Sequence, residues 1–109
     1  MAASDAAMLY VILSPVGSYF KGRESAKGLS LLADPRYTRA WPGGCGDRKM
    51  GSNYAPTIHV QKEATEKGMQ QVLWLYGEDQ QVTEAGTMNI FVFCINDQGG
   101  TKIIQVIST

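Results

Sequence analysis

A single lysine, Lys49, stands in the glycine-rich stretch GGCGDRKMGSNYAP, residues 43–56. A catalytic lysine must be a neutral amine for part of its cycle, so burial or a nearby cation must disfavour its charged form. Arg48 and Arg39 could supply that positive potential, and the glycines would let the backbone approach a ligand closely. Tyr54 could hydrogen-bond a ligand oxygen. Taken alone, however, the pattern is more typical of a solvated lysine in a surface loop.

A carboxylate with possible chemistry lies further along, in VTEAGTMN, residues 82–89. Glu84 is followed by an Ala-Gly turn and Thr87, where a carboxylate could reach into a pocket and hold a proton on a heterocyclic nitrogen. A solvated turn carboxylate is the more common role for such a residue. Lys49 and Glu84 are 35 positions apart. A strand–helix–strand passage between them could bring both to one side of a sheet.

One main helix is expected between these two residues. Its pattern runs from Asn53, a suitable N-cap, to Lys67, with Pro56 in the first turn. Glu63 can pair with Lys67 at i, i+4, and Gly68 can take the left-handed position after the last turn. The sequence therefore predicts a helix that ends just before the next strand.

The rest of the chain is rich in strand patterns, which together with the helix predict an α+β (mixed α/β) fold. A hairpin turn is expected at NDQGG, residues 96–100, and a linker at KGRESAKG, residues 21–28. The expected strands cover residues 8–14, 29–33, 70–76, 80–84, 88–95 and 101–107.

Size and charge limit the classes of function. The chain has 109 residues, enough for one small domain, and 44% of them are hydrophobic. Ten basic residues balance ten acidic ones, which argues against a nucleic-acid surface or a polybasic membrane patch. No apolar run approaches the ~18–20 residues of a membrane span. Cys45 and Cys94 lack CxxC or metal-ligand spacing, which favours free thiols in a reducing compartment over a disulfide or a metal site.

Three long segments resemble a known family. They read LYVILSPVGSYF, LSLLADPRYTRAWPGGCGDRKMGSNYAPT and QQVLWLYGEDQQVTEAGTMNIFVF. They are similar to the branched-chain amino acid aminotransferases, pyridoxal-phosphate enzymes of fold type IV, and in particular to the animal and fungal members. The resemblance runs from about Met8 to about Asp97. It implies a part of the family's large domain, with a sheet and one main helix.

The resemblance also implies roles for individual residues. Lys49 matches the lysine that forms the Schiff base with the cofactor and moves the α-proton of the amino acid. Tyr54 matches the tyrosine that hydrogen-bonds the phenolic oxygen of pyridoxal 5′-phosphate, and Glu84 the carboxylate paired with its pyridine nitrogen. Thr87 matches a threonine close to both cofactor and substrate. Arg39 matches an arginine near the cofactor.

The implied substrates are branched-chain amino acids and 2-oxoglutarate. Leu, Ile or Val would give its amino group to the cofactor, and 2-oxoglutarate would take it and become glutamate. Tyr19 matches an aromatic residue that lines the pocket for the substrate side chain. Family members are homodimers and are either cytoplasmic or mitochondrial, and both compartments stay open here. The alternative is a catalytically inactive truncated fragment that binds at most another subunit or a ligand.

The resemblance predicts a division of the chain. Residues 1–20 are expected to be the end of a truncated small domain, and residues 21–28 the linker between domains. Residues 29–109 would be the first part of the large domain, with an unmatched tail from about residue 98. Ser52 stands where the family usually has glycine. Serine would be strained there if the backbone needed a positive φ.

Overall fold

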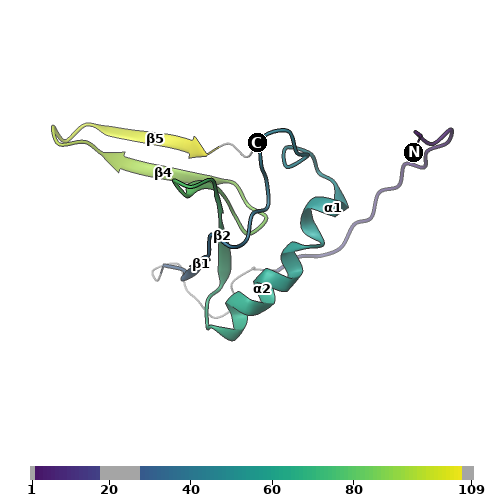
Figure 1. Cartoon of the computed structure of the whole chain (residues 1–109), viewed down its shortest axis with the longest axis horizontal. Coiled ribbons are helices and arrows are strands. Elements are labelled where there is room, and N and C mark those ends of the chain that lie inside the picture. Colours follow the sequence, from purple (N-terminus) through teal and green to yellow (C-terminus); the bar gives the residue numbers. More distant parts are fainter. Residues whose placement is uncertain (1, 18–27, 107–109) are drawn as a thin grey trace.

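The computed structural model describes residues 2–17 and 28–106 (Figure 1). It has the expected α+β composition, with helices beside two small sheets. The predicted linker lies almost entirely outside the described residues, as does Tyr19. The elements are β1 Leu31–Ala33, α1 Gly51–Tyr54, α2 Thr57–Glu66, β2 Gln71–Tyr76, β3 Gln81–Ala85, β4 Ile90–Ile95 and β5 Thr101–Val106.

The larger sheet has the order β1-β2-β3 and carries the core. β1 pairs parallel with β2, and β2 pairs antiparallel with β3. A parallel pair needs a long crossover, and here the glycine-rich loop and both helices provide it. One face of β2 packs against α2. The core cluster consists of Leu32, Val60, Ala64, Val72 and Trp74.

Helix α2 ends as its sequence predicts. Val60 and Ala64, one turn apart, are its buried residues and face the sheet. Gly68 has φ 75° and donates its N–H to Thr65 O, while Met69 donates to Ala64 O. These two bonds form a Schellman motif, and Met69 then packs against the core. The motif satisfies the last carbonyls of the helix and turns the chain into β2.

The start of the helix differs from the prediction. The helical segment begins at Gly51, and α1 is separated from α2 by Ala55 and Pro56. Asn53 is therefore not the N-cap, because it lies inside α1. Pro56 precedes the first residue of α2 rather than lying within its first turn. Since proline has no N–H to donate to the preceding turn, the helix is interrupted at this point.

Strands β4 and β5 form a separate two-stranded hairpin, as predicted. Asn96 Oδ1 accepts hydrogen bonds from the N–H groups of Gln98 and Gly100, and Gly99 has φ 76°. These contacts close the turn predicted at residues 96–100. The hairpin projects from the body of the molecule (Figure 1). Its large hydrophobic side chains are largely exposed, namely Phe91, Val92, Phe93, Ile95, Ile103 and Ile104.

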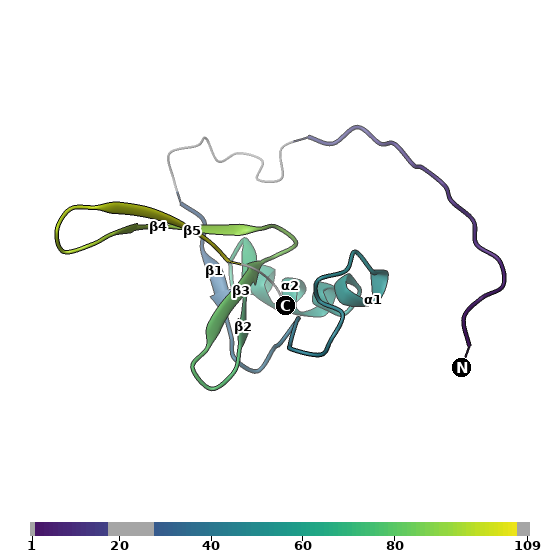
Figure 2. The same cartoon turned by 90° about the horizontal axis from the view of Figure 1, so that it is seen from above.

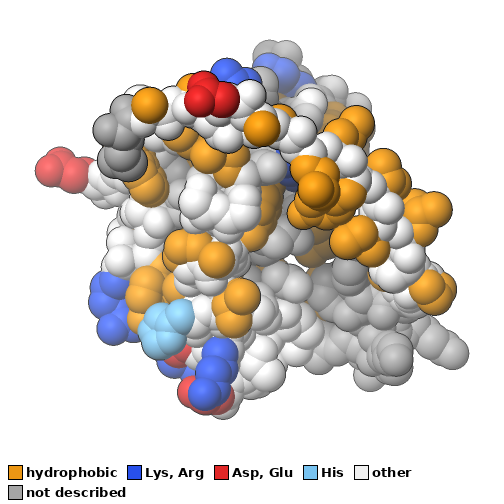
Figure 3. All heavy atoms as spheres, turned by 90° about the vertical axis from the view of Figure 1, so that its right-hand side faces the viewer, with side chains coloured by type: hydrophobic (Ala, Val, Ile, Leu, Met, Phe, Trp, Pro, Cys, Tyr) orange, Lys and Arg blue, Asp and Glu red, His pale blue; other side chains and the backbone are white. Residues whose placement is uncertain are grey.

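The strand predicted over residues 8–14 is wrong. This segment has no strand pairing within the described part of the chain, and it runs apart from the helices and sheets (Figure 2). Met8 and Leu9 are 86% and 94% exposed. Hydrophobic side chains stand out on the side of the molecule that carries the N-terminal end (Figure 3). A strand needs a second strand to bond its N–H and C=O groups, so an apolar run alone does not produce one.

A network of charges fastens the segment after β1 to α2. Glu63 accepts hydrogen bonds from Tyr37 Oη at 2.6 Å and from Lys67 Nζ at 2.5 Å, so the predicted i, i+4 pair is present. Arg36 Nη2 lies 2.6 Å from Asp34 and 3.3 Å from Glu63. The hydrogen bond from Arg36 holds the pKa of Asp34 at about 2. The bonds from Lys67 and Tyr37 lower the pKa of Glu63.

We expect the interactions that join the segment after β1 to α2 to weaken at low pH. A carboxylate with a lowered folded-state pKa stabilises the fold above its unfolded pKa of about 4, and this contribution is lost as the pH falls through the folded value. The contact of Tyr37 with Glu63 should therefore weaken as the pH falls below about 4. The Tyr37 ring resonances in NMR spectra would report it. Glu63→Gln should lose the pH dependence, whereas Glu66→Gln, at an exposed position, should keep it.

Candidate active site

The lysine loop runs from Trp41 to Met50 and is built from tight turns. Gly44 N–H bonds to Trp41 O at 3.0 Å, and Arg48 N–H bonds to Cys45 O at 3.0 Å. A Cβ on Gly44 would lie 3.0 Å from the Trp41 ring. The backbone therefore folds closely over this indole, which explains why glycine is placed there. The loop ends at α1 and so presents Lys49 just before the helix.

Asn53 anchors this loop, a role that the sequence did not reveal. Its side-chain Nδ2 donates to Cys45 O at 2.5 Å and to Arg48 O at 2.8 Å. The loop residue next to Lys49 is thereby tied to α1. In the sequence, the position of Asn53 at the junction of loop and helix is the available indication of this anchoring role. The helical pattern favours an N-cap at Asn53 instead. Ser52 has a helical backbone in α1, so the strain foreseen for a positive φ does not arise.

Glu84 is buried and paired with Arg39. It lies in β3 opposite Trp74 of β2, and the pairing of the strands fixes its position. Its Oε2 forms an ion pair with Arg39 Nε, and the two side chains are only 8% and 1% exposed. Arg39 Nη2 also donates a long hydrogen bond, 3.5 Å, to Gly46 O in the lysine loop. The predicted ring-binding carboxylate is thus held by the predicted arginine.

Lys49 lies close to two of the other predicted residues. Its Nζ is 5.5 Å from the centre of the ring of Tyr54, which lies in α1 directly after the lysine loop. Burial raises the pKa of Glu84, while the positive charges of Arg39 and Lys49 oppose that rise. Lys49 is therefore near enough for its charge to act on Glu84. Arg39 thus contacts both Glu84 and the lysine loop, and Lys49 of that loop lies beside Tyr54.

Thr87 follows β3 in an exposed turn. It borders a hollow of about 260 Å³ between α2 and β2, which Gln61 and Trp74 also line. The adjacent Gly86 is buried, so the turn has one covered and one open residue. Tyr19, the predicted substrate-pocket residue, lies outside the described residues.

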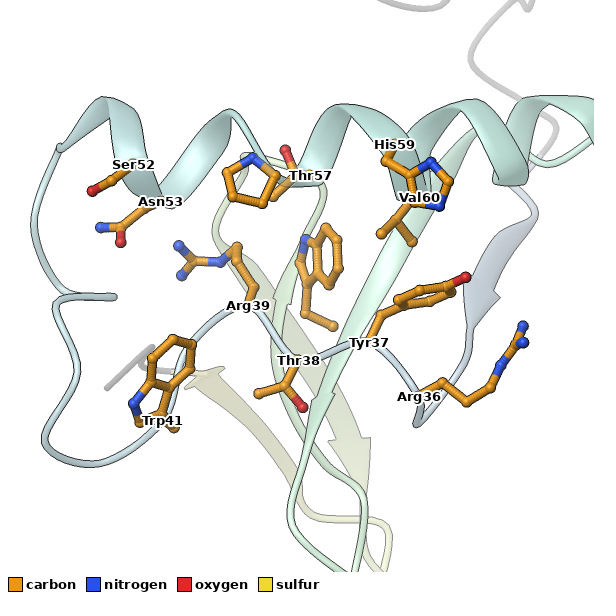
Figure 4. Close-up of a pocket in the computed structure, with 12 residues that line it drawn as sticks. Arg36, Tyr37, Thr38, Arg39, Trp41, Ser52, Asn53, Thr57, His59 and Val60 are labelled. Atoms are coloured by element: carbon orange, nitrogen blue, oxygen red, sulfur yellow. The ribbon is translucent and has the colours of Figure 1, made fainter.

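A larger hollow, of about 360 Å³, lies between the helices and the segment after β1 (Figure 4). Arg39 reaches from this segment toward α1, and Ser52 and Asn53 of α1 line the same end of the hollow (Figure 4). Trp41 closes the side next to the lysine loop, and His59 lies at the other end. Arg39, the arginine of the buried ion pair, therefore also lines this hollow.

The described residues give no support for a disulfide, a metal site or a membrane-spanning helix. Cys45 and Cys94 are both free thiols. Across residues 2–17 and 28–106, no three His, Cys, Asp or Glu side chains group in a way that could hold a metal ion. Within the same part of the chain, no helix is long and apolar enough to cross a membrane.

A comparison with protein families matches residues 4–103 to the family described as amino-transferase class IV. The match covers the two helices, the larger sheet and most of the hairpin. The chain belongs to the class IV aminotransferase family. The family uses pyridoxal phosphate.

Individual relatives of this class IV aminotransferase chain point to one branch of the family. It is 58% identical over 98 residues to the mitochondrial branched-chain-amino-acid aminotransferase of Mus musculus, a stretch that covers 90% of this chain. The mitochondrial enzyme of Rattus norvegicus is 61% identical over 97 residues, 89% of this chain. The cytosolic enzyme of Mus musculus is 58% identical over 97 residues, also 89% of this chain.

These matches occupy only part of each relative. The chain spans about a quarter of their length, namely 25%, 24% and 25% of the three enzymes. They include both mitochondrial and cytosolic proteins. Similarity of this kind therefore establishes the family of this chain and its similarity to the branched-chain enzymes.

Proposed function

We propose that this chain supplies the lysine and the ring-binding carboxylate of a pyridoxal-phosphate-dependent branched-chain aminotransferase. The observation that carries the proposal is a series of contacts between strand, loop and helix: Glu84 pairs with Arg39, Arg39 bonds to Gly46 of the lysine loop, and Lys49 lies beside Tyr54. The high identity to branched-chain aminotransferases supports the same reading.

The chemistry of these side chains fits the cofactor. A buried carboxylate suits a protonated pyridine nitrogen, because burial strengthens the attraction between opposite charges. Glu84 meets this requirement, being 6% exposed. A primary amine near a tyrosine suits the aldehyde and the adjacent phenolic oxygen, and Lys49 lies beside the Tyr54 ring. Pyridoxal phosphate, when bound, would act as the electron sink for the α-carbon of the amino acid.

Each residue then has a definite task. Lys49 Nζ would hold the cofactor and, as a neutral amine, accept the α-proton of the substrate and return it. Glu84 would accept a hydrogen bond from the ring N–H and so keep that nitrogen protonated. Tyr54 would donate to the phenolic oxygen. Thr87 would lie near the cofactor and substrate, in the turn that follows β3.

The proposed substrates are Leu, Ile or Val as donor and 2-oxoglutarate as acceptor, with glutamate as the product. The support is the similarity to enzymes that carry the branched-chain name. An apolar side chain needs no charged partner, so only the α-carboxylate requires polar donors. Tyr19 is proposed to line the side-chain pocket. The compartment is proposed to be cytoplasmic or mitochondrial, as among the relatives.

A specific observation favours a second candidate, in which the 109-residue chain is inactive by itself. Lys49 and Thr87 are exposed, so water reaches the positions where the reaction would occur. The hairpin and residues 8–13 also expose many hydrophobic side chains. A partner or subunit contact would cover such surfaces, and the unpaired edges invite association. In this reading the chain binds a ligand or subunit without turning over substrate.

One experiment addresses both candidates. The purified chain is mixed with pyridoxal phosphate, reduced with borohydride and mapped by peptide mass spectrometry. We expect the cofactor mass on Lys49 and its loss from that peptide in Lys49→Ala. Lys102→Ala removes an exposed lysine of β5 and serves as the matched control, which should keep the Lys49 label.

Turnover is measured separately, with leucine and 2-oxoglutarate. We expect none from the isolated chain, and no visible band retained after dialysis. Labelling spread evenly over the lysines would contradict the proposed site. A retained band together with turnover, both lost in Lys49→Ala, would support the enzyme and reject the inactive candidate.

A further inference from the structure

We propose that Arg39 is a positioning residue, whose buried guanidinium fixes the Glu84 carboxylate and links it to the lysine loop. This inference rests on the proposed function, because it specifies how Glu84 is prepared for a ligand nitrogen. Arg39 was expected only to lie near the cofactor. The geometry gives it a narrower task, performed through Glu84.

Arg39 and Glu84 form a buried ion pair that leaves one carboxylate oxygen outside the contact. Arg39 Nε meets Glu84 Oε2, and the two side chains are 1% and 8% exposed. A carboxylate has two oxygens, and this contact uses one of them. Oε1 is the oxygen that we assign to the ligand nitrogen. The attraction between the two buried charges holds Oε2 at the guanidinium and so restrains the carboxylate.

The charge of Arg39 also favours the ionised form of Glu84. A buried carboxyl tends to become neutral, because desolvation penalises its charged form. Glu84 experiences this effect, and the charges that oppose it come from Arg39 and Lys49. Lys49 is exposed and would change its charge during the proposed reaction, whereas an arginine stays charged throughout. Arg39 is therefore the permanent counter-charge of Glu84.

Arg39 also connects Glu84 with the lysine loop. Arg39 Nη2 donates to Gly46 O, three residues before Lys49, and Asn53 holds the carbonyls on either side of that point. The bond is long, at 3.5 Å, so it contributes little stability and mainly orients the loop relative to Arg39. One side chain thus contacts both the carboxylate and the loop of the lysine.

Stability alone does not account for such a pair. Replacing a buried ion pair by apolar residues of similar size is often neutral or stabilising, whereas removing one partner is costly. The pair therefore predicts a simple double-mutant cycle. Arg39→Met and Glu84→Leu should each destabilise the chain in urea. The double variant should be more stable than either single variant, because no unpaired charge remains.

The decisive measurement is the titration of Glu84, followed by the ¹³C shift of its carboxyl carbon in NMR spectra. Arg39→Met should raise the midpoint by about 1–3 pH units, a ~10- to 1000-fold gain in proton affinity. Arg39→Lys keeps the charge and should stay closer to the wild type. Arg36→Met is the matched control, since Arg36 is exposed and pairs with Asp34; it should leave Glu84 unchanged.

A second arm tests the connection with the cofactor. Borohydride trapping of pyridoxal phosphate on Lys49 should be slowed by roughly tenfold or more in Arg39→Met. A tenfold change corresponds to a shift of one pH unit in the midpoint of Glu84. Arg36→Met should trap at the wild-type rate. Arg39→Lys should recover part of the loss, which a merely structural defect would not.

The outcomes separate this inference from the proposed function. A folded Arg39→Met chain with an unchanged Glu84 midpoint would overturn the inference, as would additive effects of the two substitutions in the double-mutant cycle. Unchanged trapping in Arg39→Met would also overturn it. If the wild type itself fails to trap the cofactor on Lys49, the proposed function is rejected. If the Glu84 midpoint still shifts in Arg39→Met, Arg39 is then only one partner of a structural ion pair.

Discussion

Replacing Trp74 with alanine should abolish the cooperative unfolding of this chain. Trp74 is 2% exposed and lies at the centre of the core cluster, between α2 and the larger sheet. Truncating a buried tryptophan costs about 3–5 kcal/mol, through lost burial and the cavity that remains. The indole also donates from Nε1 to Gly86 O at 2.8 Å, and this carbonyl would lose its partner.

The cost is large compared with what this core can supply. Small domains are stable by only about 5–15 kcal/mol, and the buried hydrophobic residues here are few. Besides Trp74 they are Leu32, Ala40, Val60, Ala64, Val72 and Leu75. Urea denaturation followed by far-UV circular dichroism would measure the change. We expect the folded baseline of the wild type to disappear in Trp74→Ala.

The second tryptophan of the chain provides the control. Trp41 is 50% exposed and packs over Gly44 in the lysine loop. Trp41→Ala should therefore change the free energy of unfolding by only about 0.5–1 kcal/mol, as at a surface position. Equal losses for the two variants would show that the core is not centred on Trp74.

Gly86→Val should be the next most damaging change. Gly86 has φ 59°, a conformation that costs an ordinary residue about 1–2 kcal/mol and a β-branched residue more. A Cβ there would also collide with the side chain of Gln71, which would have to move. Gly86 N–H bonds to Val72 O at 2.7 Å, so a shift of this residue would disturb the core strand.

We expect Gly86→Val to lower the free energy of unfolding by about 1–3 kcal/mol. It should also weaken cofactor trapping, because the turn connects Glu84 with Thr87. Gly51→Val is the matched control, since Gly51 begins α1 with open space around its Cα. Its unfolding free energy should change by no more than about 0.5 kcal/mol. A larger loss there than at Gly86 would contradict this account of the turn.

Local patterns were sufficient for much of the fold. The helix stop at Gly68, the hairpin turn at residues 96–100 and the strands β2 to β5 follow from residues that are neighbours in the chain. Turn residues, capping residues and alternating side chains act over a few positions, so their effects can be read from a short stretch. Pro56 marks the interruption between α1 and α2 in the sequence as well, although the pattern around it predicts one continuous helix.

The family was equally accessible from the sequence, because long motifs rather than single residues carry it. Lys49, Tyr54 and Glu84 were selected through that resemblance, and their roles stay predictions. Without it, each residue had an ordinary surface role as the more common alternative. Chemistry at a site depends on several side chains meeting, and a lone lysine or glutamate does not indicate which others it meets.

Two features required the three-dimensional structure. Residues 8–14 have the composition of a strand, yet no other described segment pairs with them, so their backbone groups stay outside a sheet. Arg39 and Glu84 form a buried pair across 45 positions of chain, which no local pattern reveals. Both depend on contacts between distant segments. Such contacts form only when folding brings those segments together, whereas helix ends and turns are encoded by adjacent residues.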